Sequence, residues 1–257
     1  MARPRIIPCL LLRKTGLVKG EKFSNHRYIG DAINAVRIFN DKQVDELVVL
    51  DIDATREGRE PDYSLIEQLA GECFMPLAYG GGVRSVSQME KLYRLGCEKV
   101  IITTAAAQPG LIAEAAQRFG RQSVVVGVDV RKKLLGGYEV MSHNGTQKIA
   151  ALLPDYLERL MAEGAGEIML QAIHRDGTLQ GYDLDLIRQV APKVNVPLIA
   201  AGGANSAENL AQAIATGASG AAAGALFVFH GKHRAVLINV PSAEAMAHAF
   251  ANIQAAA

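Results

Sequence analysis

Short apolar runs alternate with longer amphipathic segments along almost the whole chain. The runs are rich in Val, Ile, Leu and Ala, which is typical of buried parallel strands, and a segment with helical periodicity follows each of them. The predicted strands are 5–12, 46–53, 76–79, 99–103, 123–129, 167–172, 197–200 and 220–223. The predicted helices are 31–40, 63–72, 86–95, 109–119, 153–163, 184–190, 206–216 and 242–253, with a hairpin-like insertion at 136–141.

Eight strand-helix units predict an α/β fold, a single (β/α)8 TIM barrel over residues 1–257. A doubly wound open sheet would also alternate strands and helices, but an internal repeat favours closure. The segment 76–85 (PLAYGGGVRS) has the same design as 197–206 (PLIAAGGANS), at an offset of 197 − 76 = 121. The chain length of 257 also lies near the ~250 residues of a typical barrel. We therefore expect two duplicated half-barrels, approximately 1–121 and 122–257.

Each of the two repeat segments ends a predicted strand with glycines and then places a serine where it can cap the next helix. Backbone N–H groups exposed at such a turn, next to a helix N-terminus, favour an anion. The repeat therefore predicts two phosphate sites on opposite sides of one barrel mouth, and a ligand with a phosphate at each end. The alternative is that the glycines only make tight turns.

The composition of the chain limits the classes of partner and the cellular location that we expect. The net charge of +1 gives no reason to expect nucleic acid or membrane binding, and no apolar run is long enough to span a membrane. Three widely spaced cysteines are typical of reduced core residues in a cytoplasmic protein. The six histidines lack metal-ligand spacing, so we expect neither a metal nor a cofactor.

Candidate chemistry lies where the strands end, because barrel active sites use that face. The long segment 13–27 predicts a lid that carries Lys19, or else a structural loop. Asp51 is a candidate ligand contact or partner of Lys19. Asp129 is a candidate general acid/base or a salt-bridged anchor. Asp176 and Thr178 can line the mouth or cap a turn.

Four charges occur at the opposite end of the barrel. Arg5, Glu46, Lys99 and Glu167 begin the first, second, fourth and sixth predicted strands, two of each sign. Such a ring can be a stability device or a gate. The charge pattern alone favours the stability device.

Several motifs together resemble the cyclase subunit of imidazole glycerol phosphate synthase, nearly from end to end. They are RIIPCL at 5–10, VKG at 18–20, LDI at 50–52, YGGGVRS at 79–85, NGT at 144–146, RDGT at 175–178, GYD at 181–183 and AGGA at 201–204. That family is a duplicated barrel that takes ammonia from a glutaminase docked on its floor. It uses the ammonia on a substrate with two phosphates.

The resemblance implies a role for each matching position. Gly82, Thr103 and Thr104 would hold one phosphate, Gly203, Gly224 and Ala225 the other, and Lys19 would be the lid lysine. Arg5, Glu46, Lys99 and Glu167 fall on the family's ammonia gate. With the resemblance, the gate becomes the favoured interpretation of the four charges, and a glutaminase subunit becomes the expected partner in a heterodimer.

The departures from the family lie at the mouth. Aligning residues 10–13 with 128–131, at an offset of 129 − 11 = 118, places Leu11 where the family has a second catalytic aspartate. Losing such an acid/base group typically costs roughly 10²–10⁴-fold in rate. His174 replaces a family Asp or Asn, Thr103 an Asn and Ala225 a Ser. The candidate catalytic residues are then Asp129, His174 and Asp176.

The segments 9–12 (CLLL) and 226–237 (LFVFHGKHRAVL) resemble a paralogous branch of the family. That branch is associated with surface-polysaccharide gene clusters, where barrel and glutaminase supply ammonia to a third enzyme, a ligase that amidinates a sugar. The leading hypothesis is such a diverged, phosphate-binding amidotransferase subunit. The alternatives are an active cyclase of histidine biosynthesis, in which Asp129 and His174 cover for Leu11, a non-catalytic ammonia-passing scaffold, and the sister isomerase.

Overall fold

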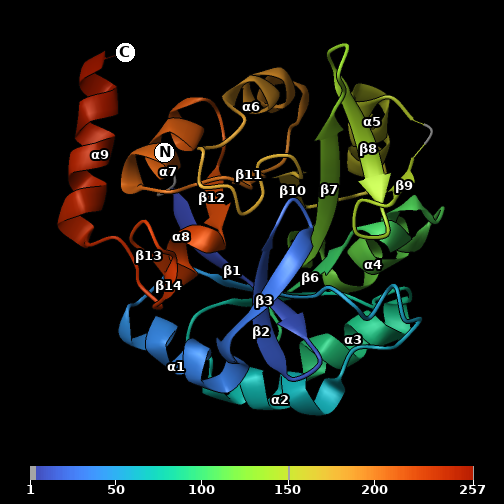
Figure 1. The fold of residues 1–257 in the computed structure, drawn as a ribbon. Helices are drawn as coiled ribbons and strands as arrows, with labels where there is room; N and C mark the ends of the chain where they lie inside the picture. The colour runs from blue at the N-terminus through green and yellow to red at the C-terminus, as the bar shows by residue number, and fades with distance from the viewer. Residues whose placement is uncertain (1–3, 150, 257) are drawn as a thin grey trace.

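A closed barrel of parallel strands forms the centre of the computed structural model, which describes residues 4–149 and 151–256 (Figure 1). The barrel strands lie in the order β10-β11-β12-β1-β4-β5-β6-β7, and β7 pairs with β10 to close the circle. They are β1 (Arg5–Arg13), β4 (Leu47–Asp51), β5 (Leu77–Gly80), β6 (Lys99–Ile102), β7 (Val124–Lys132), β10 (Glu167–Ala172), β11 (Leu198–Ala201) and β12 (Gly220–Ala223). The predicted (β/α)8 fold is confirmed.

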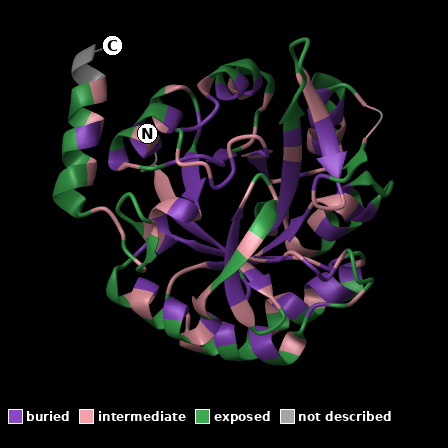
Figure 2. Cartoon of the chain, in the orientation of Figure 1, coloured by how far each residue is buried: buried purple, intermediate pink, exposed green. Residues whose placement is uncertain are grey.

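Most of the helices surround the barrel and turn their buried sides toward it, whereas the last one packs against Ala207 and Ala211 of another helix and is otherwise largely exposed (Figure 2). They are α1 (Ala32–Asp41), α2 (Tyr63–Glu72), α3 (Val86–Arg94), α4 (Leu111–Phe119), α5 (Leu153–Ala162), α6 (Leu184–Val190), α7 (Ala207–Ala215), α8 (Ala225–Val228) and α9 (Ala243–Ala256). Short 3-10 turns lie at Thr104–Ala107, Arg121–Ser123 and Ala191–Lys193. Within the described residues, no helix has both the length and the apolar character needed to cross a bilayer.

Helix caps recur at the spacing of the sequence repeat. Ser85 caps α3 and Ser206 caps α7, each by accepting a hydrogen bond from the backbone N–H three residues on. Asp62 and Asp183 cap α2 and α6 in the same way. Both pairs are 121 residues apart (206 − 85 and 183 − 62), and each cap satisfies a backbone donor that a helix start leaves free. This agreement supports the proposal of two half-barrels.

Alternate residues of each strand point into the barrel. Along β1 these are Arg5, Ile7, Cys9 and Leu11, which run from the floor, at the N-terminal ends of the strands, to the mouth at their C-terminal ends. Other strands contribute Val48, Ala78, Ile101, Val125, Met169, Ile199, Ala201 and Ala222. The middle of the barrel is therefore apolar, whereas its two ends carry the polar residues.

Three insertions interrupt the strand-helix alternation. The predicted lid at 13–27 forms a hairpin, in which β2 (Gly16–Glu21) pairs with both β1 and β3 (Ser24–Asp31) and the register of β2 with β3 shifts at two places. The predicted insertion after the fifth barrel strand forms β8 (Tyr138–Ser142), which pairs with β7, and β9 (Gln147–Lys148).

The third insertion was not predicted from the sequence. Before α9, the eighth unit contains the short helix α8 and a small hairpin of β13 (Phe229–His230) and β14 (Ala235–Val236). The single predicted helix at 242–253 is therefore only the last part of this unit.

Candidate functional site

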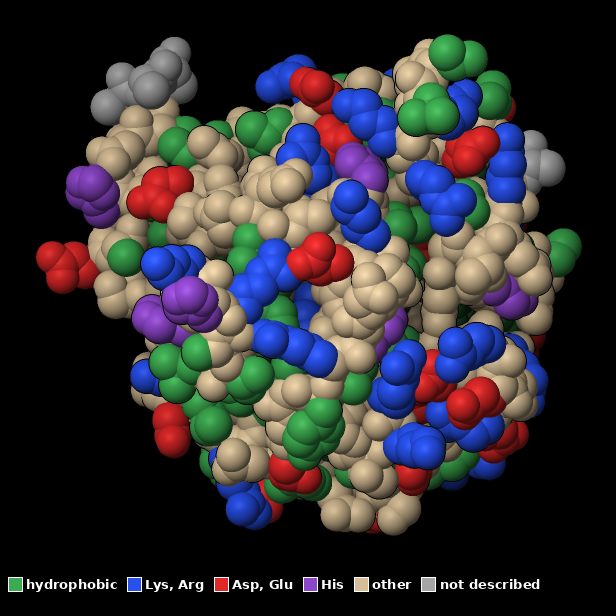
Figure 3. Space-filling view, viewed as in Figure 1, with side chains coloured by type: hydrophobic (Ala, Val, Ile, Leu, Met, Phe, Trp, Pro, Cys, Tyr) green, Lys and Arg blue, Asp and Glu red, His purple; other side chains and the backbone are tan. Residues whose placement is uncertain are grey.

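A cavity of about 550 Å³ opens at the C-terminal ends of the strands, and every barrel strand contributes to its lining. Its middle is apolar, with Cys9, Leu50 and Met169, and polar side chains lie nearer the opening. Lys and Arg side chains gather around the central part of this face (Figure 3). The position is the one that barrel enzymes use for chemistry.

Lys19 enters the cavity from β2 and is buried. Its Nζ donates to Asp176 Oδ1 at 2.8 Å, and the backbone N–H of Lys22 donates to the Asp176 carbonyl at 2.8 Å. The first hairpin is thus fixed to the loop after β10. The alternative expectation that Lys19 pairs with Asp51 is wrong.

Asp51 instead organises the loop after β4. Its Oδ1 accepts hydrogen bonds from the backbone N–H groups of Asp53 and Ala54, both at 3.0 Å, and Arg59 approaches its Oδ2 at 3.3 Å. Asp51 lines the cavity, but these bonds already occupy most of its acceptor capacity. It is therefore better suited to holding this loop than to binding an anionic ligand.

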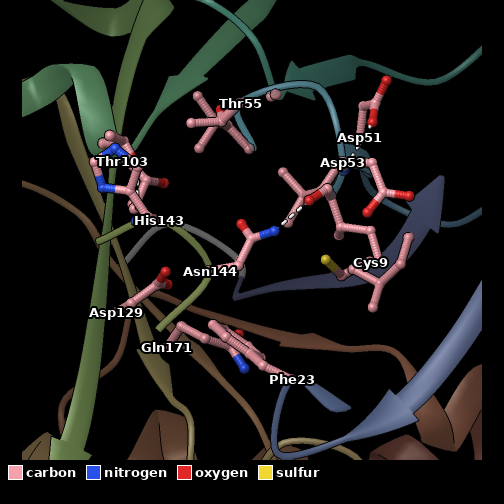
Figure 4. Close-up of a pocket in the computed structure, with 18 of the residues that line it drawn as sticks. Cys9, Phe23, Asp51, Asp53, Thr55, Thr103, Asp129, His143, Asn144 and Gln171 are labelled. Carbon is pink, nitrogen blue, oxygen red and sulfur yellow. Dashed lines mark hydrogen bonds between the residues drawn. The ribbon is translucent and has the colours of Figure 1, made fainter. Parts of the chain in front are cut away.

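Asp129 projects into the cavity from β7, on the side opposite Asp51 and Asp53 (Figure 4). Burial, and to a lesser extent the nearby Asp176 carboxylate, raises the pKa of Asp129 to about 7. A carboxyl group with such a pKa exchanges protons readily near neutral pH, which is what a general acid/base needs.

Leu11 lies at the cavity, where the resemblance implies a second aspartate, and packs with Leu50 against the apolar interior. Asp53, two residues beyond the neighbouring strand β4, also lines the cavity. Its oxygens accept from Arg13 Nε and Arg56 Nη2, both at 2.8 Å. The two guanidinium partners thus engage both carboxylate oxygens of Asp53 in ion pairs.

His174 lies outside the cavity lining, contrary to the prediction that it belongs to the catalytic set. Its Nε2 lies 2.8 Å from Asp183 Oδ2, which also accepts from Tyr138 Oη at 2.9 Å. Burial alone would raise the pKa of Asp183, but hydrogen bonds from His174, Leu186 and Tyr138 lower it well below its usual range. The Asp183 carboxylate therefore joins the start of α6 both to β8, through Tyr138, and to the loop after β10, through His174.

The first predicted phosphate site lies on the cavity wall. Gly82, Thr103 and Thr104 all line the cavity. Gly82 has a φ of +73°, and its N–H donates to Thr55 Oγ1 at 3.3 Å. Thr104 Oγ1 accepts from the backbone N–H of His143 at 3.0 Å, so its own hydroxyl proton is free to donate to an anion.

The second predicted phosphate site is only partly open to the cavity. Of its three residues, Gly224 is the one that lines it. A Cβ on Gly224 would lie 3.1 Å from Lys19 Cε, so the glycine makes room for the lysine stem. Gly203 packs against Gly181, whose N–H donates to its carbonyl at 2.8 Å, and Ala225 is buried at the start of α8.

Thr178 also lies outside the cavity lining. Its hydroxyl donates to the Arg175 carbonyl at 2.7 Å, which is the turn-capping role left open above.

The four floor charges form a closed ring, named the floor ring below. Arg5 donates to Glu46 at 2.5 Å and to Glu167 at 2.6 Å, and Lys99 Nζ lies 2.8 Å from Glu46 Oε2 and 3.3 Å from Glu167 Oε2. Each carboxylate contacts both cations. The ring therefore closes the floor with alternating charges.

Several cavity residues were missed from the sequence: Arg13, His26, Asp53, Arg56, Arg59, Arg84, His143, Asn144 and Gln171. Gln171 follows Glu167 and Met169 on the inward side of β10, so strand periodicity could have identified it. Arg56 and Arg59 follow the second strand and share its loop with Asp51. The cavity residues of the first hairpin and of the β8–β9 turn follow no such periodicity in the sequence.

The two hairpins meet over the mouth. Asn144, at the turn between β8 and β9, donates through Nδ2 to the Ile52 carbonyl across the cavity (Figure 4). A Cβ on Gly145 would lie 3.2 Å from the ring of Phe23, at the tip of the first hairpin. The cavity is thus covered from two sides.

Comparisons with known proteins agree with this geometry. Residues 5–234 match the family model described as histidine biosynthesis protein. The chain is 51% identical over 243 residues to "Putative imidazole glycerol phosphate synthase subunit hisF2" of Pseudomonas aeruginosa, covering 94% of this chain and 97% of that protein. It is 48% identical over 245 residues to "Putative imidazole glycerol phosphate synthase subunit hisF3" of Vibrio vulnificus, covering 94% of each. It is 41% identical over 226 residues to imidazole glycerol phosphate synthase subunit HisF of Streptomyces coelicolor, covering 88% of this chain and 90% of that protein.

Proposed function

Since this chain belongs to the histidine biosynthesis protein family, we propose that it is the synthase subunit of a glutamine amidotransferase. A glutaminase subunit docks on the floor and releases ammonia there. The ammonia passes the floor ring and the barrel interior and reaches a phosphorylated acceptor at the mouth.

The floor ring is the observation that carries this proposal. Arg5 and Lys99 each contact both Glu46 and Glu167, and these four side chains close the floor end of the barrel, opposite the cavity at the mouth. Stability alone does not explain why four charges lie here, because replacing buried ion pairs with apolar residues is often neutral or stabilising. A ring that opens on docking gives ammonia a path, and the apolar interior above it favours the neutral molecule over ammonium.

At the mouth, we assign Gly82, Thr103 and Thr104 to one phosphate of the acceptor, and Gly203, Gly224 and Ala225, with Thr178 behind them, to the other. The first group lines the cavity, and the hydroxyl proton of Thr104 can donate to an anion. This group therefore contributes more of the phosphate binding. Lys19 and Asp176 hold the first hairpin over the acceptor, and Asp51 shapes the loop beside it.

The acceptor we propose is a surface-polysaccharide sugar that is amidinated with the help of a third enzyme, a ligase. Leu11 supports a change of chemistry, because a leucine on β1, across the barrel from Asp129 on β7, leaves one acid/base group where the cyclase reaction of the family uses two. The greater identity to the relatives named hisF2 and hisF3 than to Streptomyces HisF also supports a separate branch.

A second candidate function is the cyclase reaction of histidine biosynthesis itself. The raised pKa of Asp129 favours it, since one carboxyl group that titrates near neutrality can act in turn as acid and base. The buried Lys19–Asp176 pair at the mouth is also compatible with a working cyclase.

One assay separates these functions. Purified chain is given ammonium at mildly alkaline pH and the bis-phosphate substrate of the cyclase, beside a Leu11→Asp variant. We expect the native chain to be slower than the variant by roughly 10²-fold or more, because the variant regains a proton-transfer group. Turnover by the native chain at the rate of an ordinary cyclase would contradict the proposed change of acceptor.

A further inference from the structure

Arg13, Asp53 and Arg56 form a compact cluster at the rim of the cavity, named the arginine clamp below. The Asp53 carboxylate accepts from Arg13 Nε at 2.8 Å through Oδ2 and from Arg56 Nη2 at 2.8 Å through Oδ1. Its side chain is only 6% exposed, whereas those of Arg13 and Arg56 are 35% and 64% exposed. A buried carboxylate thus fixes two guanidinium groups whose remaining N–H donors face solvent or the cavity.

The clamp differs from an ordinary surface ion pair elsewhere in the same chain. Arg188 pairs with Asp185 at 2.8 Å, also three residues apart, and its exposure of 66% matches that of Arg56. Asp185, however, is 68% exposed, and neither residue lines the cavity. Exposed pairs of that kind contribute little to stability, so the burial and location of the clamp need another reason.

Charge on this wall of the cavity supports anion binding. The clamp carries two cations and one carboxylate, and Arg84, on the same wall, donates to the Gly58 carbonyl rather than to a carboxylate. His26 on β3 also lines the cavity. Burial first, and then the charges of Arg13 and Lys19, lower the pKa of His26, whereas Asp176 and Asp53 act in the opposite direction.

The clamp also continues the first phosphate site along the wall. Arg56 directly follows Thr55, whose hydroxyl accepts from the N–H of Gly82. Arg56 therefore lies next to the residue that contacts the Gly82 turn, and it lines the same cavity as Gly82 and Thr104. A guanidinium group is planar and, when it is held in place, binds carboxylates and phosphates through paired N–H donors.

We propose that the arginine clamp is an oxyanion-binding subsite of the mouth, which takes a further acidic group of the ligand, a phosphate or a carboxylate. The inference rests on the proposed function in one respect, which is that the ligand of the clamp occupies the same cavity as the proposed acceptor. It adds an anionic group beyond those assigned to the glycine turns, and it makes Arg13 and Arg56 determinants of ligand specificity.

Anion titration of the isolated barrel tests the proposal. Inorganic phosphate and malonate are titrated calorimetrically into the native chain and into the variants Arg56→Gln, Arg56→Lys and Arg188→Gln. We expect Arg56→Gln to weaken binding of the preferred anion about 10-fold or more, because a charge-assisted pair of hydrogen bonds is lost. Arg56→Lys keeps the charge without the planar fork and is expected to regain only part of the affinity.

Arg188→Gln is the matched control, and we expect it to bind as the native chain does. Stronger binding of phosphate or of malonate identifies the acidic group, and either result supports the subsite. If neither anion binds, or if Arg56→Gln binds both as the native chain does, the proposal is overturned. Should Arg56→Gln fail to fold, Arg56→Lys retains a cation beside Asp53 and carries the same test.

The titration needs no glutaminase, ammonium or acceptor. Unchanged anion binding in Arg56→Gln would therefore remove the subsite and leave ammonia delivery untouched. Failure of ammonia delivery would leave the measured anion affinities as they are.

Discussion

The pKa of Asp129 is the clearest electrostatic feature of the candidate site at the scale of single residues. The carboxyl group sits where β7 enters the cavity, with apolar surroundings and a second carboxylate, Asp176, nearby. Lys19 is engaged with Asp176 rather than with Asp129. The raised pKa is therefore a cost to the folded protein at neutral pH, of the kind that active sites tolerate for the sake of proton transfer.

Replacing Asp129 with Asn should expose that cost. The pKa of Asp129 rises from its ordinary 3.8 to about 7 on folding, so the group opposes folding increasingly as the pH rises through this range. We expect the stability advantage of Asp129→Asn over the native chain to grow by at most about 1.4 kcal/mol per pH unit between pH 4 and 7, and then to level off. Urea unfolding of both chains from pH 4 to pH 8 measures the difference. A constant difference would contradict the raised pKa.

The positions of functional side chains were predicted best where a strand fixes the direction in which each side chain points. Asp129 could be placed at the mouth because it ends an apolar strand, and its inward phase follows from the alternation along β7. His174 was misplaced because it lies one residue beyond the inward phase and finds a partner, Asp183, nine residues on. The clamp was missed because Arg13 and Arg56 meet only through Asp53, a contact that no spacing along the chain reveals.

At the scale of elements, the barrel strands and main helices follow directly from the apolar runs and caps. The predicted lid is less simple, because β2 and β3 contain polar and aromatic residues without strict alternation, and β3 is largely exposed. The mostly buried β2 pairs with β1, and the exposed β3 pairs with β2, so pairing extends the hairpin beyond the buried residues. The short hairpin of β13 and β14 has the same origin, since its position depends on contacts with the first hairpin.

The contacts between these two hairpins form a latch. Arg234, before β14, pairs with Glu21 and donates to the Thr178 carbonyl at 3.3 Å. Arg27 donates to the Arg234 carbonyl, and its guanidinium lies 4.1 Å from the centre of the Phe229 ring. The first hairpin is thus also held by contacts at Glu21, close to Lys19, and at Arg27, which pairs with Lys19 across the hairpin.

Arg234→Ala should loosen the first hairpin without unfolding the barrel. Half-exposed ion pairs contribute up to about 1 kcal/mol, so we expect amide hydrogen exchange in residues 16–31 to quicken about fivefold. Exchange in the barrel strands should stay unchanged, since Arg234 contacts none of them in the hydrogen bonds and ion pairs given above. Arg188→Ala, which removes a remote surface pair, is the control. Equal protection of residues 16–31 in both variants would contradict the latch.

At the scale of the whole molecule, the barrel has two polar ends joined by an apolar interior. The mouth carries the cavity, the clamp and Asp129, and the floor carries the ring. The sequence predicted this polarity because charged residues both precede and follow the apolar strands. It also predicted a ring of the four floor charges, and the closure of β7 onto β10 brings each carboxylate into contact with both cations. The separation of the two ends is what ammonia transfer from floor to mouth requires.

Lys99→Ala tests whether the floor ring acts as a gate. Removing the lysine leaves Glu46 and Glu167 with Arg5 as their only ring partner, and opens space beneath the apolar interior. In the complex with a glutaminase, we expect glutamine hydrolysis to continue while free ammonia appears in the medium and less of it reaches the acceptor. Released ammonia and acceptor product are measured together, with Lys99→Met as a variant of similar length that lacks the charge and circular dichroism as the check on folding. If both variants fold and transfer ammonia as the native chain does, the ring serves stability alone.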